Sequence, residues 1–250
     1  MKTVATIEAR MNSTRLPGKV LMDIGGIRSL ECQIKRLEHS TFIDEIVLAT
    51  TTNEIDDELV SFASEMEISV YRGDEDDVLA RILGAAKSVD GDLQVQITGD
   101  CPLIDPVIVD QVIKTYLDFD GEIDFVSNEI IRSFPIGLDC RVFPVNILAA
   151  VDRACSDPIH RVHGSTYIYV GEGKEKYKSL NLSAPDELNH PEWRWTLDTK
   201  EDLEFLRAIT DSIGDEITTI SANDLTSWLL EHPEIISINS KVRQKRIEEG

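Results

Sequence analysis

Three cationic side chains follow a short apolar segment near the N-terminus. Residues 3–7 are apolar or β-branched, which predicts a buried strand. Arg10, Arg15 and Lys19 come directly after it, although the formal net charge of the chain is -21. A triphosphate carries about four negative charges. Arginine can donate two parallel hydrogen bonds to phosphate oxygens, and lysine places a compact positive charge beside them. The spacing fits a triphosphate-binding loop, and it also fits a basic surface loop without a ligand.

The same loop contains residues that favour a turn. Asn12, Ser13 and Gly18 stand among the cations, and successive backbone N–H groups of such a turn can hold oxyanions. Lys19 is then placed to act as a point charge near a group in transfer.

Two aspartates follow other strand-like segments. Asp100 comes after residues 93–97, which alternate as a strand, and Asp198 comes after residues 195–197. Hard Mg²⁺ takes a few carboxylates together with phosphate oxygens and water. The pair predicts a metal site if both segments end at one pocket. A turn or helix-capping role for each aspartate fits the sequence equally well.

Strand-like and helical segments alternate through the first half of the chain. This rhythm over residues 1–127 predicts an α/β fold, a mainly parallel Rossmann-like sheet with helices on both faces. In such sheets ligands bind beyond the carboxyl ends of the strands, where the basic loop lies. We expect one domain over residues 1–250, with an insertion at about 128–188 for acceptor binding or dimerisation. A peripheral helical segment is expected at about 211–250.

Composition narrows the class of protein. A hydrophobic content of 42% suffices for a core, and no apolar run is long enough for a membrane helix. The N-terminus lacks a secretory signal, and the four cysteines show no metal or disulfide spacing. We therefore expect a cytoplasmic protein with reduced cysteines. The acidic excess argues against a nucleic-acid polymer as partner.

The motifs resemble those of a known enzyme family. "ARMNSTRLPGKVL" is similar to the signature loop of the sugar-activating cytidylyltransferases, such as the CMP-KDO and CMP-sialic acid synthetases. The spore coat polysaccharide biosynthesis F-type branch is the most similar. Further matching segments are "DEIVLATTTNEIDDELV", "VYRGDEDDVLAR", "QITGDCPLIDP", "DFVSN", "PIGLDCRVF" and "WRWTLDTKEDLEFL". The resemblance covers about residues 3–210, and Asn12 stands where the branch usually has glycine.

The resemblance implies a reaction and a nucleotide site. An acceptor oxygen attacks the α-phosphorus of CTP, and pyrophosphate leaves. Mg²⁺ is bound by Asp100 and Asp198, while Lys19, Arg10 and Arg15 stabilise the triphosphate. The implied nucleotide-binding residues are Ala9, Arg10, Met11, Asn12, Ser13, Arg15, Lys19, Thr51, Arg72, Arg81, Thr98 and Asp100. The resemblance also implies a homodimer and a role in polysaccharide biosynthesis.

The acceptor is expected to be a small anion: a sugar acid, a sugar phosphate or a phosphonate. Asn128, Gly137 and Asp139 lie on the stretch that resembles the acceptor-binding region of the family. Arg161 follows Pro158 at a predicted helix start, where a cation and backbone N–H groups together favour an anion. Helix residues near an interface fit the same segment. Arg141 lies on the same acceptor-like stretch, and its alternation within a strand-like segment also fits a side chain that points to solvent.

Three other functions fit parts of the sequence. They are a nucleotidyltransferase of other base specificity, a nucleotide-sugar-dependent glycosyltransferase, and a non-catalytic nucleotide-binding subunit. A glycosyltransferase of similar fold commonly carries an Asp-x-Asp metal motif, whereas the strand here ends in "GDCP". The presence of Lys19, Asp100 and Asp198 argues against a non-catalytic subunit.

Overall fold

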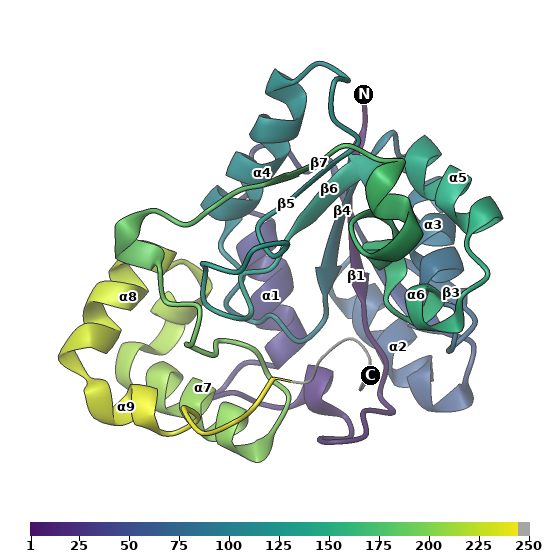
Figure 1. Ribbon diagram of the computed structural model, residues 1–250. Helices are drawn as coiled ribbons and strands as arrows, with labels where there is room; N and C mark the ends of the chain where they lie inside the picture. Colours follow the sequence, from purple (N-terminus) through teal and green to yellow (C-terminus); the bar gives the residue numbers. More distant parts are fainter. Residues whose placement is uncertain (245–250) are drawn as a thin grey trace.

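A twisted sheet with helices on both faces forms the centre of the molecule (Figure 1). The computed structural model describes residues 1–244. Its strands are β1 (Thr3–Glu8), β2 (Glu45–Thr51), β3 (Ser69–Gly73), β4 (Leu93–Thr98), β5 (Phe125–Ser127), β6 (Arg141–Pro144) and β7 (Ser179–Asn181). Its α-helices are α1 (Ser29–Leu37), α2 (Asp57–Glu65), α3 (Val78–Ser88), α4 (Pro106–Asp118), α5 (Val145–Ala154), α6 (Pro158–Val162), α7 (Lys200–Ile213), α8 (Ala222–Glu231) and α9 (Pro233–Ser237). Short 3-10 helices are η1 (Lys19–Leu21), η2 (Glu54–Asp56), η3 (Gly164–Ile168), η4 (Gly171–Glu175), η5 (Asp186–Leu188) and η6 (Gly214–Thr218).

The strand order confirms the predicted fold class. It is β3-β2-β1-β4-β6-β5-β7, and β1 pairs in parallel with both β2 and β4. Strand β6 is antiparallel to β4 and β5, whereas β7 is parallel to β5. Residues 128–188, expected as an insertion, therefore contribute β6 and β7 to the same sheet. The carboxyl ends of β1 and β4 are neighbours, which brings the basic loop close to Asp100.

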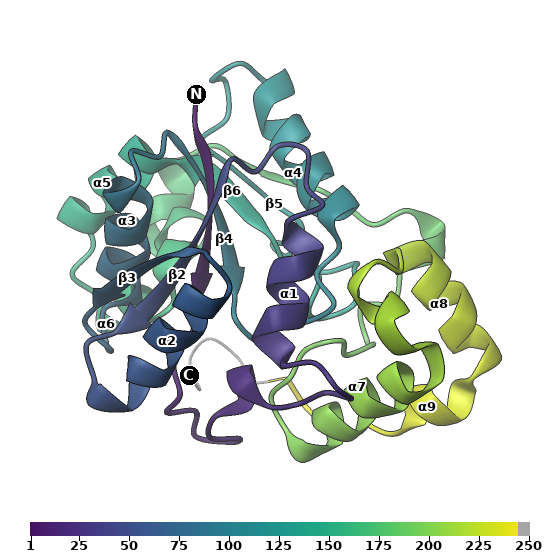
Figure 2. The same cartoon turned by 180° about the vertical axis from the view of Figure 1, so that it is seen from behind.

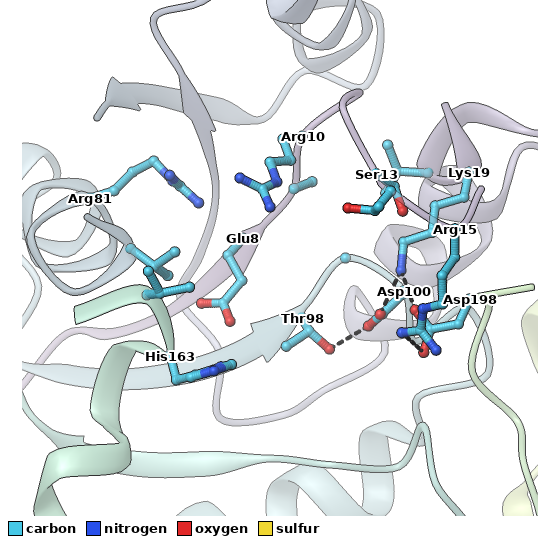
Figure 3. A pocket seen from close by; sticks show the side chains of 16 residues that line it. Glu8, Arg10, Ser13, Arg15, Lys19, Arg81, Thr98, Asp100, His163 and Asp198 are labelled. Atoms are coloured by element: carbon cyan, nitrogen blue, oxygen red, sulfur yellow. Dashed lines mark hydrogen bonds and ion pairs between the residues drawn. The ribbon is translucent and has the colours of Figure 1, made fainter. Parts of the chain in front are cut away.

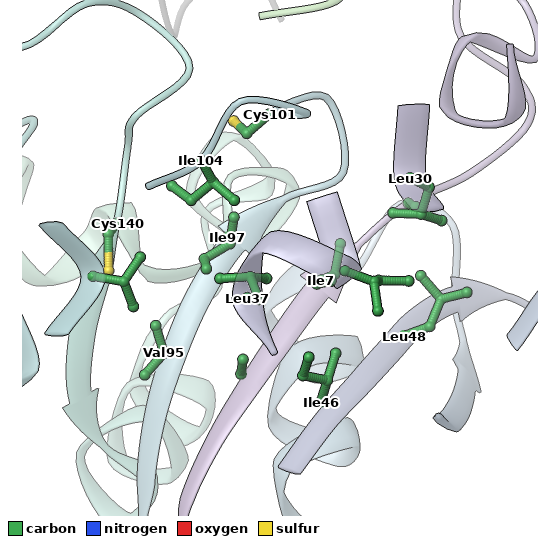
Figure 4. Close-up of a cluster of buried hydrophobic side chains, with 14 of the residues drawn as sticks. Ile7, Leu30, Leu37, Ile46, Leu48, Val95, Ile97, Cys101, Ile104 and Cys140 are labelled. Carbon is green, nitrogen blue, oxygen red and sulfur yellow. The ribbon is translucent and has the colours of Figure 1, made fainter. Parts of the chain in front are cut away.

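Apolar side chains cover both faces of this sheet. Helices α1, α2 and α4 pack on one face, as Figure 2 shows from behind. Leu30 and Leu37 of α1 are buried there against Ile7, Ile97 and other strand residues (Figure 4). Helices α3 and α5 bury their apolar residues on the opposite face. Burial of this extent is the main stabilising contribution to such a fold.

A third core holds the C-terminal helices. Trp195, Phe205 and Leu229 are buried in it, so α7, α8 and α9 pack on one another beside the sheet. The buried Arg36 of α1 donates hydrogen bonds to the carbonyl oxygens of Ile217 and Ile220, at 2.7 and 2.8 Å. The described part of the predicted C-terminal segment is helical, and its helices lie beside the sheet and pack into this core. Residues 245–250 lie outside the described residues.

One predicted strand is wrong. Residues 195–197 form no strand, and Thr196 lies in a bend; the neighbouring Arg194 makes an isolated bridge with Ile136. The N–H of Leu197 instead donates to the carbonyl oxygen of Asp100, at 2.8 Å. The backbone N–H groups of Trp195 and Leu197 thus bond to the loop residues Ile136 and Asp100 rather than to a strand, so the segment packs without joining the sheet. Within the described residues, no helix is long and apolar enough to cross a membrane.

Candidate active site

Two adjoining cavities open at the carboxyl ends of β1 and β4. The loop cavity has a volume of about 320 Å³ and the strand cavity about 580 Å³. The loop cavity is lined by Glu8, Ala9, Arg10, Ser13, Thr14, Arg15, Lys19, Val20, Val78, Arg81, Thr98, Gly99, Asp100, Val162, His163 and Asp198. The strand cavity is lined by Arg15, Gln96, Thr98, Asp100, Cys101, Glu129, Ile130, Arg132, Ile136, Asp139, Arg141, His163, Thr166, Tyr169, Val170, Thr196, Asp198 and Gln244.

The two cavities share five lining residues, which mark their common border: Arg15, Thr98, Asp100, His163 and Asp198. A ligand in the loop cavity and a second ligand in the strand cavity would therefore meet beside the two aspartates. This arrangement suits a reaction between two bound molecules.

The basic loop after β1 is fixed at several points. The N–H of Met11 donates to Asp56 Oδ1 at 2.7 Å, and Leu16 is buried in the third core. Gly18 adopts a left-handed conformation, with φ of 71°, and its N–H donates to the carbonyl oxygen of Met11 at 2.8 Å. The anchored turn directs Arg10, Arg15 and Lys19 into the loop cavity.

The Lys19 ammonium lies between the two aspartates (Figure 3). Its Nζ donates to Asp100 Oδ2 and to Asp198 Oδ1, each at 2.7 Å. Burial lowers the pKa of Lys19, but the carboxylates of Asp100 and Asp198 outweigh that effect and raise it above the ordinary lysine value. Burial would raise the pKa of Asp100, but Lys19 and the hydroxyl of Thr98 hold it well below the usual carboxyl range.

Further bonds fix Asp198. Arg15 forms an ion pair with its Oδ2 at 2.9 Å. The backbone N–H of Asp198 donates a hydrogen bond to Asp202 Oδ2 at 3.0 Å. The carboxylate of Asp202 also accepts hydrogen bonds from Nε and Nη2 of the buried Arg194. The Thr196 hydroxyl donates to the carbonyl oxygen of Asp100, at 2.9 Å, so the two aspartate segments are bonded directly to one another. The sequence prediction that these aspartates meet in one pocket agrees with this geometry.

Asp100 and Asp198 together form a donor set that fits a divalent cation. Both carboxylates converge on a single point, now occupied by one ammonium nitrogen. Residues 1–244 contain no cluster of three or more acidic, histidine or cysteine side chains suited to a metal. Mg²⁺ does not need such a cluster, because one or two carboxylates suffice when substrate phosphates supply further oxygens.

Eight of the predicted nucleotide-binding residues line the loop cavity: Ala9, Arg10, Ser13, Arg15, Lys19, Arg81, Thr98 and Asp100. Met11 and Asn12 do not line it, although their backbone shapes the turn. Thr51 is fully buried, with its hydroxyl bonded to Asp56. Arg72 donates to the carbonyl oxygens of Thr51 and Asn53, at 2.7 and 2.9 Å, and so supports the wall behind the cavity.

Charged pairs line the strand cavity. Arg132 makes two hydrogen bonds to the carboxylate of Asp139, at 2.7 and 3.0 Å. Arg141 pairs with Glu129, which also accepts from the hydroxyl of Tyr169 at 2.8 Å. Burial raises the pKa of Asp139 in spite of Arg132, whereas Arg141 overcomes burial and lowers the pKa of Glu129. Arginine forks and carboxylates thus alternate around this cavity.

The predicted acceptor residues Asp139, Asn128 and Gly137 have three different roles in the structure. Asp139 lines the strand cavity. Asn128 is fully buried and holds the cavity wall, since its amide donates to the carbonyl oxygen of Leu138 at 2.7 Å and accepts from the N–H of Cys140 at 2.8 Å. Gly137 has φ of 107°, and a Cβ there would lie 2.7 Å from the carbonyl carbon of Trp195. Glycine is therefore required for close backbone approach.

The structure places two further arginines of the acceptor-like segments. Arg161 lines neither cavity, because its guanidinium pairs with Asp77 at 2.5 Å and with Asp152 at 2.8 Å, joining α6 to the start of α3 and to α5. The charge of Arg161, which suggested an anion site at this helix start, is thus paired with carboxylates of the protein itself. Arg141 does not point to solvent. It lines the strand cavity, where Glu129 compensates its charge.

Several lining residues escaped the sequence reasoning. Glu8 ends β1 and Gln96 lies within β4, whereas Glu129 and Arg132 come from the loop after β5 and Tyr169 from the end of η3. Gln96 in "LQVQIT" is a polar residue within an otherwise apolar strand, and this pattern was the one local sign of a functional residue. The loop residues gave none, because their convergence depends on how β5, β6 and η3 pack.

Comparisons with known proteins point to one enzyme family. A family model described as cytidylyltransferase matches residues 4–134. Spore coat polysaccharide biosynthesis protein SpsF of Bacillus subtilis is 32% identical over 234 residues, which cover 91% of this chain and 94% of that protein. An uncharacterized protein of Methanocaldococcus jannaschii, MJ1063, is 32% identical over 249 residues, covering 100% and 99% of the two chains.

A solved structure of a cytidylyltransferase from Leptospira borgpetersenii is similar over nearly the whole chain. Its TM-score is 0.87 at 35% identity, with 98% of this chain and 100% of that chain covered. The similarity confirms the resemblance based on motifs and corrects its extent. It continues past residue 210 into the C-terminal segment, which the motifs alone had left out.

The ion pairs of Asp100 predict a distinct response to acid. A carboxyl whose pKa is lower in the folded than in the unfolded chain stabilises the fold at neutral pH, and this contribution is lost as the pH falls below about 4. We expect Asp100→Asn to lower the free energy of unfolding by about 2 kcal/mol at pH 7. The difference from the unsubstituted protein should shrink steadily below pH of about 4.

Urea denaturation between pH 7 and pH of about 3 measures this difference. Asp211→Asn, an exposed position on α7, is the matched control and should change stability little at any pH. A stability difference for Asp100→Asn that stays constant across the acid range would show that Lys19 does not stabilise the ionised carboxylate.

Proposed function

The chain belongs to the cytidylyltransferase family and is a CTP-dependent nucleotidyltransferase, and we propose that it transfers CMP from CTP to a small anionic acceptor with release of pyrophosphate. The acceptor class is a sugar acid, a sugar phosphate or a phosphonate. The observation that carries this proposal is the pair of cavities that meet at Asp100 and Asp198. CTP in the loop cavity and the acceptor in the strand cavity would place the reacting atoms at their shared border.

The charges of the loop cavity support a triphosphate with a divalent ion. Among the described residues, Arg10, Arg15, Lys19 and Arg81 face Glu8, Asp100 and Asp198, so four positive charges meet three negative ones. A triphosphate brings about four negative charges, which this balance alone does not neutralise. Mg²⁺ held by Asp100 and Asp198 would neutralise phosphate charge and align the phosphate oxygens for in-line displacement.

The cationic side chains of the loop then have separate tasks. Arg10 is the second residue after β1; it lines the loop cavity and is paired with Glu75 at 2.9 Å, so its guanidinium is already oriented. Arg15 and Lys19 contact the aspartates and lie where charge develops as pyrophosphate departs. Donors fixed in advance at such a point stabilise the transition state without reorganisation.

The strand cavity suits an acceptor that carries both hydroxyl groups and an anionic group. Asp139 and Glu129 can accept hydrogen bonds from hydroxyl groups, while Arg132 and Arg141 can donate to a carboxylate, phosphate or phosphonate. The strongly acidic chain repels anions in general, so an anionic acceptor needs such local cations.

Pyrophosphate release tests the reaction. Each of the four ribonucleoside triphosphates is incubated with Mg²⁺ and one of three acceptor sets: sugar acids, sugar phosphates or phosphonates. We expect release with CTP and one anionic acceptor class, abolished by chelation of the metal. Asp198→Asn should reduce the rate on the order of 100-fold or more. Release with uncharged sugars alone, or equal rates with and without a chelator, would contradict the proposal.

The acceptor side gives a second prediction. Arg132→Met keeps much of the apolar stem but removes the charge. We expect it to raise the acceptor KM by more than tenfold and to change the KM for CTP little, because Arg132 lines only the strand cavity. Arg161→Ala, by contrast, should leave both KM values nearly unchanged.

Paired KM measurements with the identified acceptor decide between the two arginines. The control is the double variant Arg132→Met/Asp139→Asn, which removes both charges of the partly buried pair. If the double variant recovers normal acceptor KM, the single variant acted through an uncompensated Asp139, and Arg132 does not bind the anion. A larger acceptor effect from Arg161→Ala than from Arg132→Met would restore the expectation drawn from the sequence.

A further inference from the structure

Glu8 places a negative charge in a cavity suited to an anionic ligand. It is the last residue of β1, and its carboxyl lines the loop cavity. Within residues 1–244, the hydrogen bonds to this carboxyl come from Gln96 Nε2, at 3.1 Å to Oε1 and 2.9 Å to Oε2. Phosphate oxygens would be repelled by Glu8, so its task in the binding of a nucleotide lies elsewhere.

The hydrogen-bonding role of Glu8 is fixed by its neighbours. The backbone N–H of Ser165, which can only donate, bonds to Gln96 Oε1 at 3.3 Å, and the Ser165 hydroxyl donates to the same atom at 2.6 Å. The amide nitrogen of Gln96 must therefore face Glu8. Gly164, with φ of 62°, permits this approach, since a Cβ there would lie 2.5 Å from Gln96 Nε2. Glu8 is thus held as an acceptor, with lone pairs left for a ligand.

Arg81 supplies donors on the same side of the cavity. Its Nη1 donates to the carbonyl oxygens of Asp74 and Glu75, at 2.6 and 3.2 Å, while Nε is buried without a hydrogen-bond partner among the described residues. Figure 3 shows Glu8 and Arg81 on one side of the cavity and Lys19, Asp100 and Asp198 on the other. Val78 adds an apolar surface to the lining.

This arrangement matches the base of the nucleotide rather than its phosphates. In a nucleoside triphosphate, the base is the part farthest from the terminal phosphates, and Glu8 and Arg81 lie away from the residues suited to the phosphates. Cytosine offers the N4 amino group as donor beside the acceptors N3 and O2. Uracil carries an acceptor at O4 and a donor at N3, so the pattern is reversed.

We propose that Glu8 determines the specificity for cytosine, by accepting a hydrogen bond from the N4 amino group while Arg81 donates to the adjacent acceptors of the base. This inference rests on the proposed function, because it places CTP in the loop cavity. The carboxylate of Glu8 would repel O4 of uracil, because both groups are hydrogen-bond acceptors. UTP should therefore bind more weakly than CTP, since Glu8 would be left without a hydrogen-bond donor.

The substitution Glu8→Gln gives a sharp test, because Gln96 determines how the new amide turns. Its oxygen would accept from Gln96, so its NH₂ group would face the base as a donor. Binding of CTP, UTP and dCTP in the presence of Mg²⁺ is measured by titration calorimetry, which needs no acceptor substrate. We expect CTP and dCTP to bind at least tenfold more weakly and UTP to bind equally or more tightly.

Two outcomes would overturn the inference. An unchanged ratio of CTP to UTP affinity would show that Glu8 does not contact the edge of the base. If Glu8→Gln weakens the binding of CTP and UTP equally but changes the binding of dCTP little, Glu8 contacts the ribose 2′-hydroxyl instead. Glu58→Gln, an exposed position on α2, controls for the removal of one negative charge and should leave the ratio unchanged.

The proposed function fails in a different way. If the unsubstituted protein binds none of the three nucleotides, the assignment of the loop cavity to CTP is wrong. If it binds CTP more tightly than UTP and Glu8→Gln keeps that preference, only the role of Glu8 is wrong. Thermal unfolding of both variants, expected within a few degrees of the unsubstituted protein, shows that each one is folded.

Discussion

The Lys19 ammonium holds together two carboxylates that belong to segments almost a hundred residues apart in the chain. Asp100 follows β4 and Asp198 precedes α7, and without a shared cation their charges would repel each other in a partly buried site. Much of the surrounding structure serves this contact. The left-handed turn at Gly18 directs Lys19 inward, and Thr196 bonds the two aspartate segments across the end of the sheet. The contact of Lys19 with Asp100 and Asp198 therefore determines where the two cavities meet and where the reaction is expected to take place.

This contact also divides the site into two chemically different halves. On one side, the three cations of the first loop together with Arg81 outnumber the three acidic groups, which suits a polyanion accompanied by a metal ion. On the other side, Arg132 and Arg141 are each matched by a carboxylate, which suits a ligand with donors and acceptors as well as charge. A protein with a formal net charge of -21 can thus bind two anions, because local pairing rather than overall charge determines the field inside each cavity.

Sequence reasoning succeeded where local pattern determines structure. The alternation of strands and helices predicted the parallel core, and Arg15, Asp100 and Asp198, which stood out in the sequence, lie at the border of the two cavities. It failed where a role depends on long-range packing. Arg161 had the local features of an anion site, yet tertiary contacts with Asp77 and Asp152 use its charge for structure. Residues 195–197 had strand character, but their backbone N–H groups bond to the loop residues Ile136 and Asp100 rather than to a strand. Arg132 had no local signal at all.

Binding of Mn²⁺ to the nucleotide-free protein tests most directly whether Lys19 and a divalent ion share one site between Asp100 and Asp198. The affinity can be followed by electron paramagnetic resonance for the unsubstituted protein and for Lys19→Met. Removal of the ammonium frees both carboxylates, so the variant should bind Mn²⁺ at least tenfold more tightly, and adding Asp198→Asn should abolish the gain. Equal or weaker binding by Lys19→Met would contradict the account, because the two carboxylates would then not form a common cation site.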